Sequence, residues 1–209
     1  MTFPPFPARL SAPAAAAAAV ALTVSGAAFA QKGWETFDSS RAFASAPGPA
    51  FTLRLPPGMR QDPGHAGQAV HAGPADARNR LLMFRVIVPK AMPKEYSTFI
   101  NEEGEKAFFL QYAAQLAEHE QGKLYHLEFP ETPDATAEAY IRSAAGSGPD
   151  GSLLSFDVWR VIVKEGVILQ FGCSYIVPEG VAASEGLSSA DNPGYGAYCR
   201  PFLDSLAYK

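Results

Sequence analysis

The chain has 209 residues, with 17 Lys and Arg against 21 Asp and Glu and a formal net charge of −4. This length predicts about one folded domain, large enough to bury a hydrophobic core. No run of Lys or Arg occurs in the chain, so nucleic acids and anionic membrane surfaces are not expected among its partners.

Residues 1–30 have the pattern of a secretory signal peptide. Arg9 supplies the positive charge, and Ala14–Val24 is an almost unbroken apolar run. The triplet Ala28–Ala30 matches the small-x-small pattern that signal peptidase accepts. We expect cleavage after this triplet, which leaves Gln31 as the first residue of the mature protein.

An uncleaved membrane anchor is the alternative for this segment. Its apolar run is shorter than the ~20 residues that span a bilayer, and no second long apolar stretch follows it. We therefore expect a periplasmic or secreted protein that has no stable membrane insertion after signal cleavage.

The expected mature chain starts with a lead, 31–49, that is rich in Ser, Ala, Gly and Pro. We predict that this lead is irregular and is pinned by its aromatic side chains to a single α+β domain at 50–209. Phe51–Leu55 alternates apolar and polar residues, as a half-buried strand does, and Pro-Pro-Gly ends it. The loop region 61–80 is rich in Gly, Ala and Pro, with one short strand expected near 69–71.

Leu81–Val88 is continuously apolar except for Arg85, which is typical of a strand buried on both faces. A long helix is predicted next, from about Pro93 to a stop at Gly122, because apolar residues recur at helical spacing. Gly104 lies in the middle of this segment. Because glycine destabilises a helix interior, both one long helix and two shorter helices fit the sequence.

The remaining segments are predicted as a strand-rich region followed by a helix. Strands are expected at 124–129, 135–142, 153–163 and 167–177, with turns at 146–151 and 164–166 and a loop at 178–191. Asn192 and Pro193 suit the start of a C-terminal helix, in which Pro201 marks a late start or a kink.

Meandering strands with separate helices predict an α+β fold class. The expected architecture is an antiparallel β-sheet packed by a long helix and a C-terminal helix. The two helices cover either one face of the sheet or one face each.

Cys173 and Cys199 are the only cysteines of the chain. In an exported protein an even count favours a disulfide, and closing a loop of this length stabilises the fold by roughly 3–4 kcal/mol. The spacing is not Cys-x-x-Cys, so a thioredoxin-like redox pair is not expected. Two free buried thiols are the alternative.

Several segments resemble the PsbP-like α/β-sandwich group. Phe51–Met59, with the sequence FTLRLPPGM, resembles the opening strand and Pro-Gly turn of the group. The strand 81–88 before a long helix, the hairpin 158–175 and the closing segment 202–206 resemble its later elements, so the likeness runs from about Phe43 to the end. The resemblance implies a largely non-enzymatic protein that acts by binding or by assisting assembly, with no catalytic residues to carry over.

His65 and His71 lie in the Gly-rich loop with Asp62 and Asp76. A metal site needs three or four converging ligands, and nothing in this loop has zincin or EF-hand spacing. We therefore predict solvated loop residues and neither a metal nor a cofactor. The other two histidines are expected at the end of the long helix and on a strand face (His119 and His126).

No catalytic group of residues stands out in the sequence. Gly172–Ser174 lies within a predicted strand and is not a Gly-x-Ser-x-Gly elbow. Gly146–Gly151 joins two strands and opens no helix, so it is predicted as a turn and not as a phosphate cradle. Glu102, Glu103 and Glu105 are predicted to form a solvated helix face.

Aromatic residues gather toward the end of the sequence. The group comprises Trp159, Phe171, Tyr175, Tyr195 and Tyr198. Core packing is the expected role, and an exposed patch that binds a partner is the alternative.

The leading hypothesis is an exported, non-catalytic binding or assembly-accessory protein of the cell envelope. Its partner would be a protein or a small ligand that the sequence does not identify. The alternative is a hydrolase or metal-dependent enzyme whose site is assembled from distant residues, with His65, His71 and Asp76 as the candidate ligands.

Overall fold

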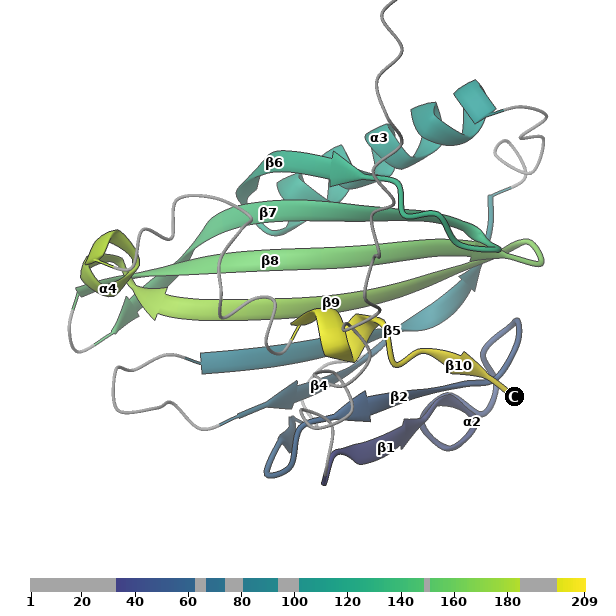
Figure 1. The fold of residues 1–209 in the computed structure, drawn as a ribbon, viewed down its shortest axis with the longest axis horizontal. Helices are drawn as coiled ribbons and strands as arrows, with labels where there is room; N and C mark the ends of the chain where they lie inside the picture. Colours follow the sequence, from purple (N-terminus) through teal and green to yellow (C-terminus); the bar gives the residue numbers. More distant parts are fainter. Residues whose placement is uncertain (1–32, 63–66, 74–80, 94–101, 149–150, 185–198) are drawn as a thin grey trace, which may run out of the picture.

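The computed structural model describes residues 33–62, 67–73, 81–93, 102–148, 151–184 and 199–209. Most of them belong to two antiparallel sheets, one of seven strands in the order β3-β4-β5-β9-β8-β7-β6 and one of three strands in the order β1-β2-β10 (Figure 1). In chain order the elements are β1 (Glu35–Asp38), α2 (Ser39–Ala42), β2 (Phe51–Leu55), β3 (Arg60–Asp62), β4 (Gln68–Ala72), β5 (Leu81–Ala91), α3 (Glu102–His119), β6 (Gly122–Glu128), β7 (Ala135–Gly148), β8 (Gly151–Lys164), β9 (Val167–Pro178), α4 (Glu179–Ser184) and β10 (Ala207–Tyr208).

The hairpin of β8 and β9 forms the centre of the large sheet. Successive side chains of a strand point to opposite faces, so Val158 enters one hydrophobic core and Trp159 enters the other. Glu165 and Gly166 at the turn have φ angles of 52° and 73°. Positive φ at both positions matches the right-handed twist of the two strands. The predicted hairpin turn is confirmed.

Different elements cover the two faces of the large sheet. Helix α3 packs on one face, mainly against β6 and β7. The small sheet and the helical segment 199–203 pack on the other face. Figure 1 shows α3 beside β6 and β7, and the yellow C-terminal helix beside β9 and β5. The predicted α+β fold class is confirmed, and the two helices take one face each.

Aromatic side chains fill the core between the two sheets. Phe51 meets Phe171 edge-on at 5.2 Å between ring centroids, and Phe84 meets Phe202 at 4.7 Å. All four are fully buried, and burial of each such side chain is worth roughly 1.5–3 kcal/mol. These contacts join the small sheet and the C-terminal segment to the large sheet.

The prediction of an irregular lead at 31–49 is wrong within its described part. Strand β1 pairs with β2, and α2 follows it directly, with the side chain of Asp38 accepting a hydrogen bond from Ser40 N. Trp34 and Phe37 are buried in the core, as their aromatic character predicted. A strand of four residues is too short to show a period, and its pairing with β2 is what stabilises it.

The end of the chain also differs from the prediction. Helix α4 occupies the start of the predicted loop 178–191. The described part of the C-terminal helix is 199–203, and it includes Pro201. The helix ends before Leu206, because Ser205 Oγ donates to the carbonyl oxygen of Phe202 and also accepts from a backbone N–H of β2. The chain then pairs with β2 as strand β10, which no sequence pattern indicated.

Helix α3 runs without a break through Gly104, so within the described residues the long helix is not divided. Gln121, with a φ of 50°, takes the left-handed conformation at the end of the helix. Gly122, the predicted stop, opens β6 instead, where a Cβ would lie 2.7 Å from the carbonyl oxygen of Arg142. None of the helices in the described part of the chain has the length and apolar character needed to cross a bilayer.

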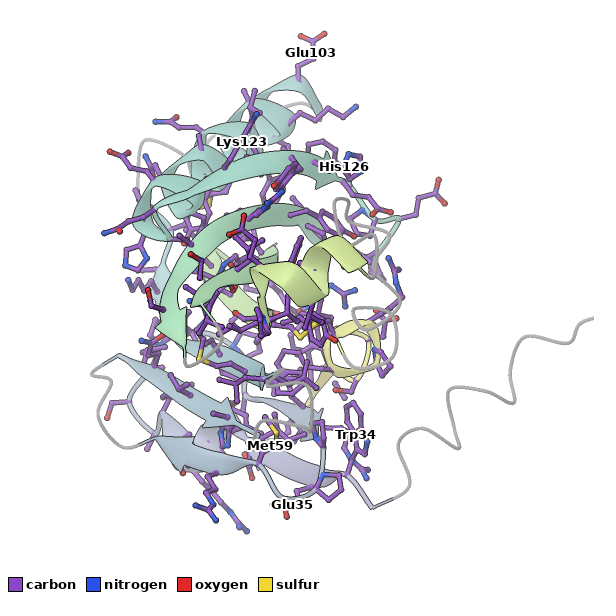
Figure 2. All side chains as sticks on the ribbon, turned by 90° about the vertical axis from the view of Figure 1, so that its left-hand side faces the viewer. Trp34, Glu35, Met59, Glu103, Lys123 and His126 are labelled. Atoms are coloured by element: carbon purple, nitrogen blue, oxygen red, sulfur yellow. A yellow bond between two sulfur atoms is a disulfide. The ribbon has the colours of Figure 1, made fainter. Side chains whose placement is uncertain are left out.

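Strand β6 is an outer edge of the large sheet. Its register against β7 shifts between Leu124 and His126, so Tyr125 is an extra residue that forms a bulge. Tyr125 is 43% exposed. Figure 2 shows Lys123 and His126 on this strand, far from Trp34 in the half of the molecule that holds the small sheet.

A disulfide joins Cys173 on β9 to Cys199 in the helical segment, the pairing expected from the sequence. The two Cα atoms lie 5.4 Å apart, and both residues are fully buried in the core between the sheets. The bond therefore holds the C-terminal segment against the large sheet from inside the core.

Candidate functional site

Of the candidate ligands of the alternative metal site, His65, His71 and Asp76, only His71 lies in the described part of the chain. The ring of His71, on β4, meets the ring of Phe37 edge-on at 5.8 Å between centroids. His65 and Asp76 lie outside the described residues, and Asp62 ends β3. Within the described part of the chain, no three His, Cys, Asp or Glu residues converge as metal ligands. The prediction that His71 is a solvated loop residue is wrong, because it lies on β4 with its ring against Phe37 and its Nε2 buried.

Burial lowers the pKa of His71 from its usual value of 6.5. A base with a lowered pKa in the folded state contributes stability above its unfolded pKa, and this contribution is lost as the pH falls through the folded pKa. We expect the free energy of unfolding to decrease as the pH falls below 6.5, and the His71→Gln variant to lose this part of the decrease. Urea unfolding at several pH values measures it.

The control for this variant is His119→Gln, because the side chain of His119 is 83% exposed. The control should keep the wild-type pH profile. A wild-type profile as flat as that of His71→Gln would show that His71 remains free to take up a proton in the folded state.

Three of the five C-terminal aromatic residues are buried in the core. Trp159, Phe171 and Tyr175 are at most 5% exposed, and the first two point to opposite faces of the sheet. They do not form an exposed binding patch, so that alternative is wrong for these three residues. Tyr195 and Tyr198 lie outside the described residues.

The other predicted polar positions lie on the surface. Glu103 points away from the molecule near the start of α3 (Figure 2). Glu105 is partly buried on the same helix, and His126 is exposed on β6. The described side chains therefore agree with a solvated helix face and a sheet-face histidine.

A cleft opens on the face of the large sheet that α3 covers. It lies between α3 and the strands β4, β5 and β9, and it has a volume of about 380 Å³. This volume is within the range of small-molecule sites. The polar residues that line it include Gln68, Arg85, Lys90, Tyr112, Glu120 and Gln170.

Arg85 and Trp159 line the floor of the cleft, and Gly172 lies between them in the sheet. Arg85, Gly172 and Trp159 face one another across β5, β9 and β8. The six-membered ring of Trp159 lies over Gly172, where a Cβ would come within 2.7 Å of it. The guanidinium of Arg85 lies 4.2 Å from the ring centroid, in a cation–π contact. Glycine at position 172 is therefore what allows the indole to lie flat on the sheet.

Arg85 is the centre of a buried charge network. Its Nη1 donates to both carboxylate oxygens of Glu120, at 2.8 and 2.9 Å. Its Nη2 donates to Asp157 Oδ1 at 3.0 Å and to Ser174 Oγ at 2.9 Å. Burial raises the pKa of Asp157, and the charge of Arg85 opposes this shift. The network ties the residue just after α3 to the floor of the sheet, so it fixes one wall of the cleft.

Tyr112 and Gln170 connect the helix wall to the floor. The hydroxyl of Tyr112 donates to Gln170 Oε1 at 3.0 Å. Burial raises the pKa of Tyr112 above its usual value of 10, so the hydroxyl keeps its proton at neutral pH. Because Oε1 accepts this hydrogen bond, the Nε2 group of Gln170 keeps its two donors for other partners.

A second charge network lies on the opposite face of the sheet. Arg160 Nε donates to Glu138 Oε1 at 2.7 Å, and its Nη2 donates to Asp204 Oδ1 at 2.6 Å. The hydroxyl of Tyr140 lies 3.0 Å from a carboxylate oxygen of both Glu138 and Glu128. This network joins the chain after the C-terminal helical segment to the sheet, which is a structural role.

The cleft is not among the sites that the sequence predicted. The one feature of the sequence that indicates the cleft is Arg85, the single charged residue in the otherwise apolar run 81–88. A charge is rarely buried without a partner, so this position already implied a buried carboxylate elsewhere. Gln170 and Tyr112 gave no signal, since both occupy ordinary amphipathic positions.

Comparisons with known proteins agree with this architecture. No protein-family model and no curated protein matches the chain in sequence. Among solved structures, a single-substitution mutant of the protein Mog1 has a TM-score of 0.50 at 8% identity, covering 83% of this chain and 95% of that one. The Ran-binding protein Mog1p of Saccharomyces cerevisiae has a TM-score of 0.49 at 8% identity, covering 83% and 94%. Cyanobacterial PsbP from Synechocystis has a TM-score of 0.47 at 8% identity, covering 84% and 92%.

At this level of identity a likeness establishes the fold and nothing further. The match to the Mog1 mutant extends over most of both chains. The protein therefore has the PsbP-like α/β-sandwich fold that the resemblance in its sequence predicted.

Proposed function

We propose that the protein is an exported, non-catalytic binding or assembly-accessory protein, and that its ligand site is the cleft beside α3. The observation that carries this proposal is the construction of the cleft. A buried Arg85–Trp159 stack forms its floor, and the ion pair of Arg85 with Glu120, the residue just after α3, joins this floor to the wall. A rigid floor with polar groups around it is typical of small-ligand sites.

Several polar groups of the cleft are committed to one another, which favours binding over catalysis, and His119 is the lining residue best suited to acid–base chemistry, with its Nδ1 3.4 Å from Glu120 Oε1. The described lining of the cleft contains no Ser, Thr or Cys, so it offers none of these nucleophiles. The Glu120 carboxylate is committed to Arg85 by two hydrogen bonds, which makes it a poor general base. A second candidate function as a metal enzyme gains no support from His71, which packs against Phe37.

Two observations support export to an oxidising compartment. Residues 1–30 have the signal-peptide pattern, and the disulfide between Cys173 and Cys199 is of the kind that persists outside the cytosol. The intact mass of the protein recovered from the envelope or medium tests this. A chain that begins at Gln31 supports export, whereas a chain that retains its first thirty residues contradicts it.

Blocking the cleft tests the proposed site. Gln115→Trp places an indole at the cleft wall on α3, and Leu110→Trp places one on the same helix at a position that is 56% exposed and outside the cleft. Native mass spectrometry of the exported protein, purified from the cells that produce it, reports bound ligand or partner. The wild type and Leu110→Trp should retain it, and Gln115→Trp should lose it.

If Gln115→Trp still retains the bound ligand or partner, the binding site lies outside the cleft. If the wild type is purified without any bound ligand or partner under every growth condition, a binding role is contradicted.

A further inference from the structure

We infer that the cleft binds a small amphipathic carboxylate, with Lys90 and the side-chain amide of Gln170 holding the carboxylate group. This inference rests on the proposed function, because it names the class of ligand for the same cleft. Three features of the described residues carry it: an uncommitted cation, an oriented amide donor and an adjacent apolar wall.

The first feature is the distribution of charge in the cleft. The Arg85 guanidinium is engaged by the carboxylates of Glu120 and Asp157. Lys90 lines the same cleft and is exposed, and it makes no ion pair with any described residue. Lys90 is therefore the cation of the described lining that has no carboxylate partner, and it is the group to which a negatively charged ligand would be drawn.

The second feature is the position of Gln170 relative to Lys90. Lys90 lies opposite Ile168 on β9, and Gln170, two residues further along that strand, lies opposite Ile87; a register shift of β5 falls between Ile87 and Lys90. Diagonal neighbours of this kind are within reach of long side chains. Because Tyr112 donates to Oε1 of Gln170, the Nε2 group is the part of the amide that is left to bind a ligand. An ammonium group and an amide N–H both donate hydrogen bonds, and a carboxylate supplies two oxygens that accept them.

The third feature is the rest of the lining. Ile87 is a partly exposed apolar residue of the lining beside these polar groups, and the buried Leu116 and Trp159 contribute small exposed areas to it. A ligand with a short hydrocarbon body next to its carboxylate would cover this surface and gain hydrophobic stabilisation. A doubly charged phosphate fits less well, since the described lining has one uncommitted cation and the neighbouring Glu120 repels a second negative charge.

The test uses the full mature chain and follows the indole N–H signals by NMR. The chain has two tryptophans: Trp159 lines the cleft, and Trp34 lies in the core next to the small sheet and serves as the internal reference. The probes are hexanoate and its uncharged analogue hexanamide. Hexanoate should shift the Trp159 signal along a saturable curve and leave Trp34 unchanged, and hexanamide should bind about tenfold more weakly, since it cannot form a charge-assisted hydrogen bond.

Two variants test the recognition pair. Lys90→Gln should weaken hexanoate binding about tenfold and remove the preference for hexanoate over hexanamide. Lys123→Gln, which removes an exposed lysine of β6 outside the cleft, should leave both affinities unchanged. A free fatty acid and a peptide C-terminus share this chemistry, so an N-acetyl dipeptide with a free carboxylate and its amide form a second pair of probes. Tighter binding of hexanoate indicates a fatty acid as the natural ligand, and tighter binding of the N-acetyl dipeptide indicates a peptide C-terminus.

The outcomes separate this inference from the proposed function. Equal binding of carboxylates and amides at Trp159 overturns the carboxylate class while the cleft remains a binding site. If no probe shifts Trp159 and Gln115→Trp still abolishes retention of the natural ligand, the inference is wrong and the proposed function stands. If the probes do not bind and Gln115→Trp has no effect, both are wrong.

Discussion

Replacing Cys173 and Cys199 together with alanine should lower the free energy of unfolding by about 3–4 kcal/mol. The bond closes a loop between residues 26 apart, and losing it restores that much chain entropy to the unfolded state. For a chain of this size the melting temperature should fall by about 10 °C. Calorimetry of the wild type and the double variant measures both quantities.

Reductant provides the control for this experiment. Both sulfur-bearing residues are fully buried, so a reductant should leave the melting temperature of the folded wild type unchanged until unfolding exposes the bond. The double variant should be insensitive to reductant at all temperatures. A double variant as stable as the wild type would mean that the disulfide contributes nothing to the fold.

Replacing Arg85 with methionine should cost about 3–5 kcal/mol of stability, because the change leaves a buried carboxylate without its cation. Asp157 is 2% exposed, and Arg85 is its only ion-pair partner among the described residues. The ion pair between Arg85 and Glu120, the residue just after α3, is lost as well. The matched control is Arg142→Met, whose guanidinium lies over the Phe156 ring at 5.8 Å with no carboxylate partner in the described part of the chain. The control should cost less than about 1 kcal/mol.

The loss of stability caused by Arg85→Met should depend on pH in a defined direction. Burial already raises the pKa of Asp157 above 3.8, and removing Arg85 raises it further. An acid with a raised pKa favours the folded state below its unfolded pKa, and this contribution is lost as the pH rises through the folded pKa. The cost of Arg85→Met should therefore be smallest in acid and grow toward neutral pH.

A second substitution separates the buried charge from the lost packing. Arg85→Met combined with Asp157→Asn should recover part of the stability, since it removes the unpaired carboxylate. Urea unfolding as a function of pH measures all of these variants. A cost of Arg85→Met that is independent of pH would indicate that packing, and not the charge of Asp157, dominates at this position.

The long strands of the large sheet could be predicted from local pattern because their side chains alternate between two cores. Val158 and Trp159 illustrate this, since each enters a different hydrophobic cluster. Strands β1 and β10 could not be predicted, because they have four and two residues. Their structure comes from pairing with β2, a contact between segments far apart in the chain.

The candidate site was harder to predict than the fold for the same reason. Arg85 was visible as a charge in an apolar strand, but its partner Asp157 is 72 residues away. No local period connects two such positions, and only the register of β5, β9 and β8 brings them together. The alternative metal site at His65, His71 and Asp76 was inferred from residues close together in sequence, and sequence proximity is a weak guide to convergence.

The bulge at Tyr125 has a consequence for how this protein behaves at high concentration. An uninterrupted outer strand offers a row of unpaired N–H and C=O groups on which another molecule can build. The irregular backbone of β6 breaks that row, and the charged side chain of Lys123 beside it disfavours the approach of a second copy. At high concentration, this edge therefore disfavours the joining of sheets from neighbouring molecules into fibres.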